Sequence, residues 1–323
     1  MADMFKTWRK ATRLAQKRRP ISAALALQDL FKPAASARVR KRSKPQPGPQ
    51  ETRPNPGSFI TAKHKSRYGV IAYRLYTPVG SSRRRMPLLV MLHGCTQTAE
   101  DFATGTRMNQ LADELGVLVL YPEQSQKANF ARCWNWHTPE NQSAGAGEAG
   151  MIASLTRHVI GLCNANPARI YIAGISAGGA AAAIIGAAYP RLYVAIGVHS
   201  GVAVGDIQTL RSALTAMQGK GGARPTGKLP RQLPTIVFHG DQERAAMGPL
   251  TLRTVTGTSD GGRAFTRRVF QGRAGSALLE EWIVHGSGHG WSGGSPLGSH
   301  TDPAGPDASR EMLRFFLARR RGV

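Results

Sequence analysis

Cysteine is scarce in this sequence. Its 323 residues include only Cys95, Cys133 and Cys163, so at most one internal disulfide can form. So few cysteines exclude a small scaffold that is held together by several disulfides. A chain of this length has enough residues instead to bury a sizeable hydrophobic core, in one large α/β domain or in two smaller ones.

Long apolar runs are also lacking. No stretch reaches the roughly 18 apolar residues of a transmembrane helix, so no such helix is expected. The apolar patch at residues 21–27 follows several basic residues, but it is too short for a secretory signal and no clear cleavage site follows it. This N-terminus favours the cytoplasm or an export route that needs no such signal.

Acidic residues are few. The chain carries 43 Lys and Arg against 19 Asp and Glu, a formal net charge of +24. The excess is uneven, because residues 1–50 hold 13 of the basic side chains and 2 of the acidic ones. The basic residues cluster there without interleaved aromatic residues or a known reader motif, so we expect no specific nucleic-acid partner. Nothing in the sequence indicates an oligomeric state.

Residues 1–32 are interpreted as a basic N-terminal arm. If residues 3–18 are helical, apolar side chains fall on one side of the helix and basic side chains on the remainder. The apolar positions are Met4, Phe5, Trp8, Ala11 and Ala15, and the basic positions are Lys6, Arg9, Lys10, Arg13 and Lys17. Such a helix suits contact with an anionic or apolar surface. A solvated, partly disordered tail is the alternative.

Residues 33–57 are rich in proline and in charge, a composition that predicts a linker. After this linker, residues 58–323 are predicted to form the folded domain, because short apolar segments there alternate with helical patterns. Strands are expected at 59–64, 69–78, 87–94, 117–122, 169–174, 193–201, 235–240 and 279–286, and helices at 98–116, 146–163, 177–188, 207–217 and 307–320. Residues 219–231 and 257–263 are expected to be Gly-rich loops.

This alternation predicts an α/β fold, with a mostly parallel sheet and helices on both of its faces. Ser176 lies in "AGISAGG", between the strand at 169–174 and the helix at 177–188. A Gly-x-Ser-x-Gly sequence at such a turn is typical of the nucleophile elbow of an α/β-hydrolase. Gly174 and Gly178 leave room for the tight turn. An ordinary helix N-cap is the alternative role for Ser176.

A serine nucleophile needs a base and an orienting acid, and in this fold the acid follows the serine and the histidine comes last. The segments "FHGDQE" and "HGSGHGW" arrive in that order, each after a predicted strand. His285 ends its strand, whereas His289 lies in a Gly-rich loop that can lean over the serine. His289 is therefore the predicted base, with an ordinary surface loop histidine as the alternative.

Two backbone N–H groups must also bind the oxyanion that forms on the substrate. One belongs to the residue after the nucleophile, which is Ala177, and the other to the loop after the third strand. The segment "LHGCTQT" assigns the second N–H to Cys95. His93 in the same segment is expected to be a hydrogen-bonded structural residue rather than a second base.

Six separated segments carry a resemblance to a known family. They are "LVMLHGCTQTAEDF", "ARCWNWH", "IYIAGISAGGAAA", "GVHSG", "FHGDQE" and "GHGWSGGSPLGSHTDPAGPDASREMLRFFL". Together they resemble the esterase family of polyhydroxybutyrate depolymerases, related to feruloyl and acetylxylan esterases, from about Gly57 to Arg319. The resemblance implies an extracellular serine esterase that acts on short-chain hydroxyalkanoate polyesters or oligomers. The positions that match its nucleophile, base and oxyanion donors are Ser176, His289, Cys95 and Ala177.

The sequence departs from this family at the acid. The family usually has aspartate three residues after the glycine of the His-Gly pair, where this chain has Glu243. We expect Glu243 to orient the base on motif position, with Asp241, two residues earlier, as the rival. Two other functions stay open, namely a feruloyl or acetylxylan-type esterase and a catalytically decayed surface-binding protein on the same fold.

Three tryptophans are candidates for flat apolar walls that bind an ester or a polymer chain. They are Trp134, Trp136 and Trp291, and the last of these follows the predicted base by two residues. Core aromatics are the alternative for Trp134 and Trp136.

The cysteines leave one question open. Cys95 and Cys133 either form a disulfide that ties the oxyanion loop to the tryptophan loop or remain free thiols. Cys163 is expected in the core. The histidines lack the spacing of metal ligands and the mechanism needs no metal, so we expect neither a metal nor another cofactor.

Overall fold

The computed structural model describes residues 57–79, 85–201, 233–241, 253–271 and 277–322 of the chain. The predicted arm at 1–32 and all of the predicted linker except Gly57 lie outside these residues. The predicted helix at 207–217, the predicted loop at 219–231 and Glu243 lie outside them as well.

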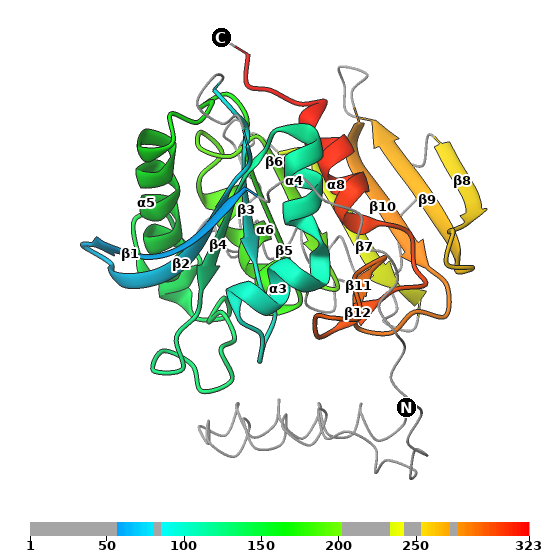
Figure 1. Ribbon diagram of the computed structural model, residues 1–323, viewed down its shortest axis with the longest axis horizontal. Coiled ribbons are helices and arrows are strands. Elements are labelled where there is room, and N and C mark those ends of the chain that lie inside the picture. The colour runs from blue at the N-terminus through cyan, green and yellow to red at the C-terminus, as the bar shows by residue number, and fades with distance from the viewer. Residues whose placement is uncertain (1–56, 80–84, 202–232, 242–252, 272–276, 323) are drawn as a thin grey trace, which may run out of the picture. The chain divides into compact units, whose positions relative to one another are not determined.

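Within the described residues, ten strands form one sheet at the centre of the domain (Figure 1). Their order across the sheet is β1-β2-β4-β3-β5-β6-β7-β10-β9-β8. The strands are β1 (Ser58–Ser66), β2 (Gly69–Thr77), β3 (Leu88–Leu92), β4 (Leu118–Glu123), β5 (Ile170–Ile175), β6 (Ala195–His199), β7 (Thr235–Gly240), β8 (Arg253–Thr258), β9 (Ala264–Gln271) and β10 (Ala277–Val284). Neighbours from β4 to β10 are parallel, whereas β1, β2, β8 and β9 form antiparallel pairs at the edges. This arrangement confirms the predicted α/β fold.

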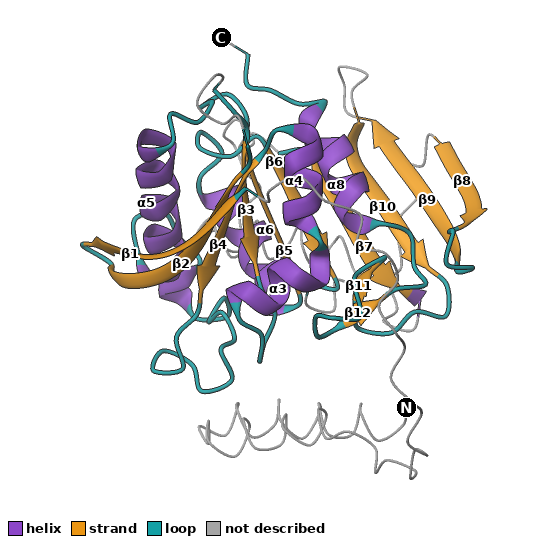
Figure 2. Cartoon of the chain, viewed as in Figure 1, coloured by secondary structure: helices purple, strands orange, loops and turns teal. Residues whose placement is uncertain are grey.

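Helices cover both faces of the sheet (Figure 2). The described ones are α3 (Ala99–Thr106), α4 (Met108–Leu115), the short 3₁₀ helix η3 (Pro139–Asn141), α5 (Gly147–Leu162), α6 (Ala177–Ala188) and α8 (Ala308–Leu317). Phe102 of α3 shares a buried cluster with Leu89, whereas Ile152 of α5 shares another cluster with Leu88. Successive strand residues thus alternate between two cores. No helix in the described ranges is long and apolar enough to cross a membrane.

The predicted helix at 98–116 is in fact two helices, so that prediction was wrong. α3 ends at Thr106 and α4 begins at Met108, and Arg107 between them has a φ of 53°. A non-glycine residue in this left-handed conformation interrupts a helix. A tertiary contact supports this conformation of Arg107, because its guanidinium donates to the carbonyl of Gly293. Helical periodicity in the sequence carries no information about such a contact.

The last two strands at one side of the sheet, β9 and the edge strand β8, were not predicted. They form an antiparallel hairpin whose connection spans 259–263, so the predicted loop at 257–263 begins inside β8. Gly257 pairs with Phe265, and a Cβ at Gly257 would lie 2.8 Å from the Phe265 ring. The glycine therefore makes room for an aromatic ring on the opposite strand, although in the sequence it indicates a loop.

The elements around Ser176 agree with the prediction. α6 and β7 have the predicted bounds, and β5 begins and ends one residue later than expected. The strands β3, β5, β6, β7 and β10 run parallel, so their carboxyl ends lie along one edge of the sheet. The segments that follow these strands carry the predicted site residues, and in open α/β sheets this edge is where ligands bind.

Candidate active site

Ser176 occupies the turn between β5 and α6. Its backbone has a φ of 56° and a ψ of −122°, and such a strained conformation persists in a non-glycine residue only where the surrounding structure enforces it. The Ser176 N–H donates to the carbonyl of His199 at 2.9 Å, which ties the turn to the end of β6. The Ser176 side chain makes no helix-capping hydrogen bond, so the N-cap alternative is not supported.

Two glycines make this turn possible. A Cβ added at Gly178 would lie 2.2 Å from the carbonyl oxygen of Leu92 and 2.4 Å from that of His93. A Cβ added at Gly174 would lie 2.4 Å from the carbonyl oxygen of Gly178. These neighbours are main-chain atoms that cannot rotate away, so only glycine fits at either position. The backbone thus has the geometry expected of a nucleophile elbow.

The loop after β3 packs against this turn. His93 is fully buried, its Nδ1–H donates to the carbonyl of Gly94 at 2.8 Å, and its Nε2 accepts from the Gln124 N–H at 3.1 Å. Burial lowers the pKa of His93, so the ring stays neutral. The Gln97 Oε1 accepts from the Gly94 N–H at 2.9 Å. These bonds confirm the structural role predicted for His93, and they fix the loop that carries Cys95.

Cys95 and Cys133 form a disulfide, so the bridged alternative is correct. The next residue, Thr96, has a φ of 68°, and its N–H donates to the carbonyl of Ala131 at 2.6 Å. A covalent bond and a main-chain hydrogen bond on adjacent residues therefore join the loop after β3 to the loop after β4. Cys163, at the end of α5, is a half-buried free thiol that packs against one core cluster, so it lies at the edge of the core and not inside it as predicted.

His289 lies in the loop after β10 and is exposed. Burial, and after it the charge of nearby His289, lowers the pKa of His199 to about 3 and also lowers the pKa of His300. Because the charge of His289 acts on both His199 and His300, His289 lies near these two rings. Since the Ser176 N–H binds the main chain of His199, the predicted nucleophile and the predicted base both lie beside the end of β6.

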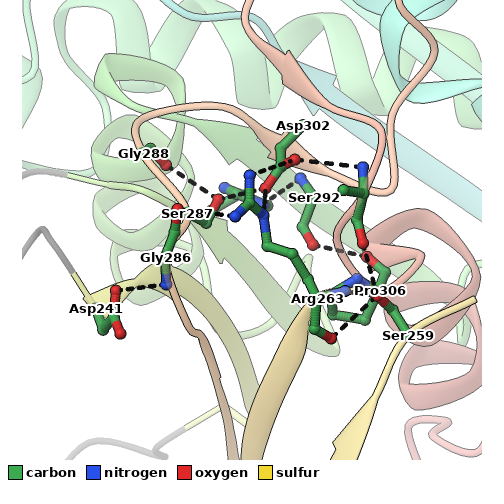
Figure 3. A network of polar contacts seen from close by, with 11 residues as sticks. Asp241, Ser259, Arg263, Gly286, Ser287, Gly288, Ser292, Asp302 and Pro306 are labelled. Atoms are coloured by element: carbon green, nitrogen blue, oxygen red, sulfur yellow. Dashed lines mark hydrogen bonds and ion pairs between the residues drawn. The ribbon is translucent and has the colours of Figure 1, made fainter. Parts of the chain in front are cut away.

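A polar network holds the loop of His289 in place (Figure 3). Asp302, which ends the short strand β12 (Thr301–Asp302), accepts from Arg263 Nε at 2.6 Å and from Ser287 Oγ at 2.6 Å. Burial alone would raise the pKa of Asp302, but the hydrogen bonds from Arg263 and Ser287 hold it below its usual value. The Arg263 Nη1 also donates to the carbonyl of Gly286 at 2.9 Å. Arg263 and Asp302 form an ion pair, and its two members bind Gly286 and Ser287. These bonds fix the residues just before His289.

Asp241, the rival acid, directly follows β7. Its Oδ1 accepts from the Gly286 N–H at 2.9 Å, and its Oδ2 lies 3.2 Å from Nδ1 of His285. Both carboxylate oxygens thus contact the first two residues after β10, and Figure 3 shows the bond to Gly286. These contacts favour Glu243 over Asp241 as the acid that orients His289, and that assignment stays a prediction.

Trp134 and Trp291 are buried, which contradicts their predicted role as substrate-binding walls. Trp134 is 0% exposed and its indole N–H donates to the carbonyl of His93 at 3.0 Å. Trp291, in the short strand β11 (Trp291–Ser292), is 1% exposed and donates to Ser309 Oγ at 3.0 Å. Both indoles are core residues that support loops of the site. Trp136 is half-buried, and its contact with substrate stays a prediction.

The polar residues that support the loops were not predicted. Besides Asp302 and Arg263, they include Glu148 of α5, which accepts from Gln124 Nε2 at 2.6 Å and from the Asn135 N–H at 2.8 Å. Burial raises the pKa of Glu148. Asp302 lies in a segment that carries the family resemblance, and this was the one signal in the sequence that could have indicated its role. Glu148 and Arg263 lie outside those segments, and no spacing rule connects them to the site.

Comparison with known proteins agrees with this geometry. A model of the family described as "Esterase PHB depolymerase" matches residues 71–230. Feruloyl esterase B of Neurospora crassa is 28% identical over 265 residues, which cover 75% of this chain and 87% of that protein. Poly(3-hydroxyalkanoate) depolymerase C of Paucimonas lemoignei is 28% identical over 228 residues, which cover 63% of this chain and 55% of that one. The chain thus spans about half the length of that depolymerase.

Among solved structures, an acetyl xylan esterase from Aspergillus awamori matches with a TM-score of 0.56 and 17% identity. The match covers 80% of this chain and 99% of that chain, and it supports the fold. The family match, the strand order and the turn at Ser176 lead to one conclusion. The chain is similar to the polyhydroxybutyrate depolymerase-type esterases, and it is a carboxylic ester hydrolase with the α/β-hydrolase fold.

Proposed function

We propose that the chain cleaves aliphatic polyesters of the poly(3-hydroxybutyrate) type, or their short oligomers, through an acyl-enzyme on Ser176. The strained turn at Ser176 carries this proposal. Backbone strain of this kind clusters at active sites, and here it falls on a serine at the sheet edge where ligands bind in α/β folds. The loop of His289 and the loop of Cys95 follow strands that end at the same edge.

His289 is the proposed base in both halves of the reaction. It takes the proton of Ser176 as the serine oxygen attacks the ester carbonyl, and it then gives that proton to the departing alcohol. In the second half, water loses a proton to His289 and attacks the acyl-enzyme, and the proton returns to Ser176 as the acid product leaves. Glu243 is proposed to orient the imidazole.

The main-chain N–H groups of Ala177 and Cys95 are the proposed oxyanion donors. Ala177 is the first residue of α6, and the first N–H groups of a helix have no intrahelical partner and lie at the positive end of its dipole. The disulfide to Cys133 holds the loop of the second donor. Loss of one such donor typically lowers kcat by about 100- to 1,000-fold, so the position of this loop matters to the rate.

Reduction of the Cys95–Cys133 disulfide is therefore expected to lower kcat. We expect at least about a tenfold loss, because displacement of the Cys95 N–H weakens one oxyanion contact. The variant Cys133→Ala tests the same bond without a reductant, and Cys163→Ala is the matched control because Cys163 is a free thiol outside these loops. Both are assayed with p-nitrophenyl butyrate. A wild-type kcat in Cys133→Ala would mean that the bridge does not position the donor.

Two exposed apolar side chains lie on the loops beside Cys95 and support an apolar polymer as the substrate. Phe130 is 75% exposed and Leu297 is 85% exposed. Phe130 precedes Ala131, whose carbonyl binds the Thr96 N–H, and the segment of Leu297 leads to His300, whose Nε2 lies 3.3 Å from Thr96 Oγ1. Large apolar side chains that stay exposed beside a site suit a water-insoluble partner.

A feruloyl or acetyl ester of a plant polysaccharide is the second candidate substrate. The match to feruloyl esterase B favours it, because that match covers 75% of this chain, against 63% for the depolymerase.

Product analysis separates the two candidates. On a film of poly(3-hydroxybutyrate) we expect release of hydroxybutyrate oligomers, and on feruloylated xylan little release of ferulate. The double variant Phe130→Ser and Leu297→Ser should lose about tenfold more activity on the film than on p-nitrophenyl butyrate, because apolar burial drives adsorption. Leu162→Ser, which changes another exposed leucine at the end of α5, is the control. Ferulate without oligomers would favour the second candidate.

The disulfide and the basic arm bear on where the protein acts and on what it contacts. The Cys95–Cys133 disulfide supports an oxidising, extracellular location, since such bonds are rare in the cytosol. The basic arm at residues 1–32 is proposed to contact an anionic or apolar surface, as its composition suggests.

A further inference from the structure

His199 is a buried histidine that the reaction above does not use. It is the last residue of β6 and is 2% exposed. Its ring lies between two aromatic rings, with centroids 5.7 Å from Phe238 and 4.9 Å from Trp291, nearly parallel to the first at 7°. A phenylalanine ring would pack equally well between these two rings. Packing therefore does not explain why this position carries a ring with polar nitrogen atoms.

Hydrogen bonds connect His199 to both halves of the proposed site. Its carbonyl accepts from the Ser176 N–H at 2.9 Å, within the strained turn. Its Nε2 accepts from the Ser292 N–H at 2.9 Å, and Ser292 follows His289 by three residues. Its Nδ1 lies 3.1 Å from Ser200 Oγ. One residue therefore binds the main chain of the nucleophile's turn and the main chain just after the loop of the base.

These partners fix the ring in one form. Because Nε2 accepts a main-chain N–H, the proton of the neutral ring lies on Nδ1 and is donated to Ser200 Oγ. Burial, and after it the charge of His289, lowers the pKa of His199 to about 3, so the ring remains neutral and Nε2 remains an acceptor at the neutral pH at which esterases are assayed. His199 is thus a constant structural link rather than a proton carrier.

We propose that His199 is a positioning residue that sets the distance between Ser176 and His289. Its carbonyl holds the serine turn and its imidazole holds the strand β11 that ends the loop of His289. Ser292 is 1% exposed, so without this acceptor its N–H would be buried with no replacement from water. The loop of His289 would then shift relative to a serine whose own conformation is strained. This inference rests on the proposed function, because it assumes that Ser176 and His289 react together.

Two substitutions separate the hydrogen bond from the packing. His199→Phe keeps an aromatic ring between Phe238 and Trp291 but removes the acceptor for the Ser292 N–H. We expect kcat to fall by about 10- to 100-fold, the effect of a small misplacement of reacting groups, while KM for p-nitrophenyl butyrate stays near the wild-type value. The rate at which a small fluorophosphonate labels Ser176 should fall in parallel.

His199→Gln is the conservative rescue. Its side-chain oxygen reaches the place of Nε2 and can accept the Ser292 N–H, so we expect a loss in kcat of only roughly fivefold, the effect of one weakened neutral hydrogen bond. Phe316→Leu is the stability control, because Phe316 lies in the same buried cluster as Phe238 and Trp291 and stacks on Tyr171. It should lower the melting temperature without lowering kcat.

Ser200→Ala keeps the proposal testable if His199→Phe does not fold. It leaves the ring in place but removes the partner of Nδ1, and we expect kcat to fall by roughly fivefold. A wild-type kcat and labelling rate in His199→Phe, or in Ser200→Ala where His199→Phe is unfolded, would overturn the positioning role. Retained activity in Ser176→Ala would instead overturn the proposed function, so the two failures are distinguishable.

Discussion

Ser176→Ala is expected to abolish turnover of p-nitrophenyl butyrate. We expect kcat to fall by at least about 10,000-fold, because removal of the nucleophile leaves only the contribution of the oxyanion donors and of binding. The fold should survive, since the Ser176 side chain makes no helix-capping bond. Alanine also relieves no strain, because φ of 56° is unfavourable for it as well. The kcat of the purified variant and its circular dichroism spectrum check both expectations.

The acid variants provide the matched comparison for this result. Glu243→Gln keeps the size of the side chain but removes its charge, and we expect kcat to fall by at least about 100-fold because the imidazolium loses its partner. Asp241→Asn should cost much less, because the contacts of Asp241 are to His285 and Gly286. The opposite order of the two losses would make Asp241 the acid, and full activity in Ser176→Ala would contradict the acyl-enzyme route.

Gly178→Ala is expected to destabilise the protein strongly. Its new Cβ would lie 2.2 Å from the carbonyl oxygen of Leu92 and 2.4 Å from that of His93. Both oxygens belong to the end of β3 and the loop of Cys95, so relief of the clash must displace main chain. We expect a loss of about 3 kcal/mol or more in the free energy of unfolding, at the upper end for overpacking. Urea denaturation measures it.

Gly161→Ala is the matched control, because it adds the same methyl group in an open place. Gly161 lies in α5, and a Cβ there would meet nothing within 4 Å. Alanine favours a helix over glycine by up to about 1 kcal/mol, so this variant should be as stable as the wild type or more so. Equal stability of the two variants would mean that the turn at Ser176 is less tight than described.

Much of the fold around Ser176 could be predicted because local signals there agree with tertiary structure. The apolar run of β5, the Gly-x-Ser-x-Gly sequence and the alanine-rich α6 each favour their own element, and the glycines are required by main-chain contacts. The structural role of His93 was predictable for a similar reason, since its neighbours in sequence shape the same loop.

The errors arose where distant contacts decide the structure. Helical periodicity continues through residue 107, but the bond from Arg107 to Gly293 supports a break there. Trp134 and Trp291 lie in segments that carry site residues, which suggested that they contact substrate. Both indoles are instead buried, and their N–H groups donate to the carbonyl of His93 and to Ser309 Oγ. No local pattern distinguishes a ring that faces substrate from one that supports a loop from within.

Contacts between residues far apart in the sequence also explain two features that were not predicted. These are the ion pair of Arg263 with Asp302 and the role of His199. Arg263 ends the connection of a hairpin that sequence patterns did not reveal, and its partner Asp302 lies 39 residues further along the chain. His199 combines a main-chain bond to Ser176 with a ring bond to Ser292, 93 residues away. Such links become visible only once the sheet brings the segments together.

Covalent labelling tests the central claim most directly. The purified protein is treated with a fluorophosphonate, digested, and analysed by mass spectrometry beside a His289→Ala variant. The account predicts one modified peptide that carries the label on Ser176, formed rapidly in the wild type and at least about 100-fold more slowly without the base. An unlabelled Ser176, or a label that attaches equally fast without His289, would contradict it.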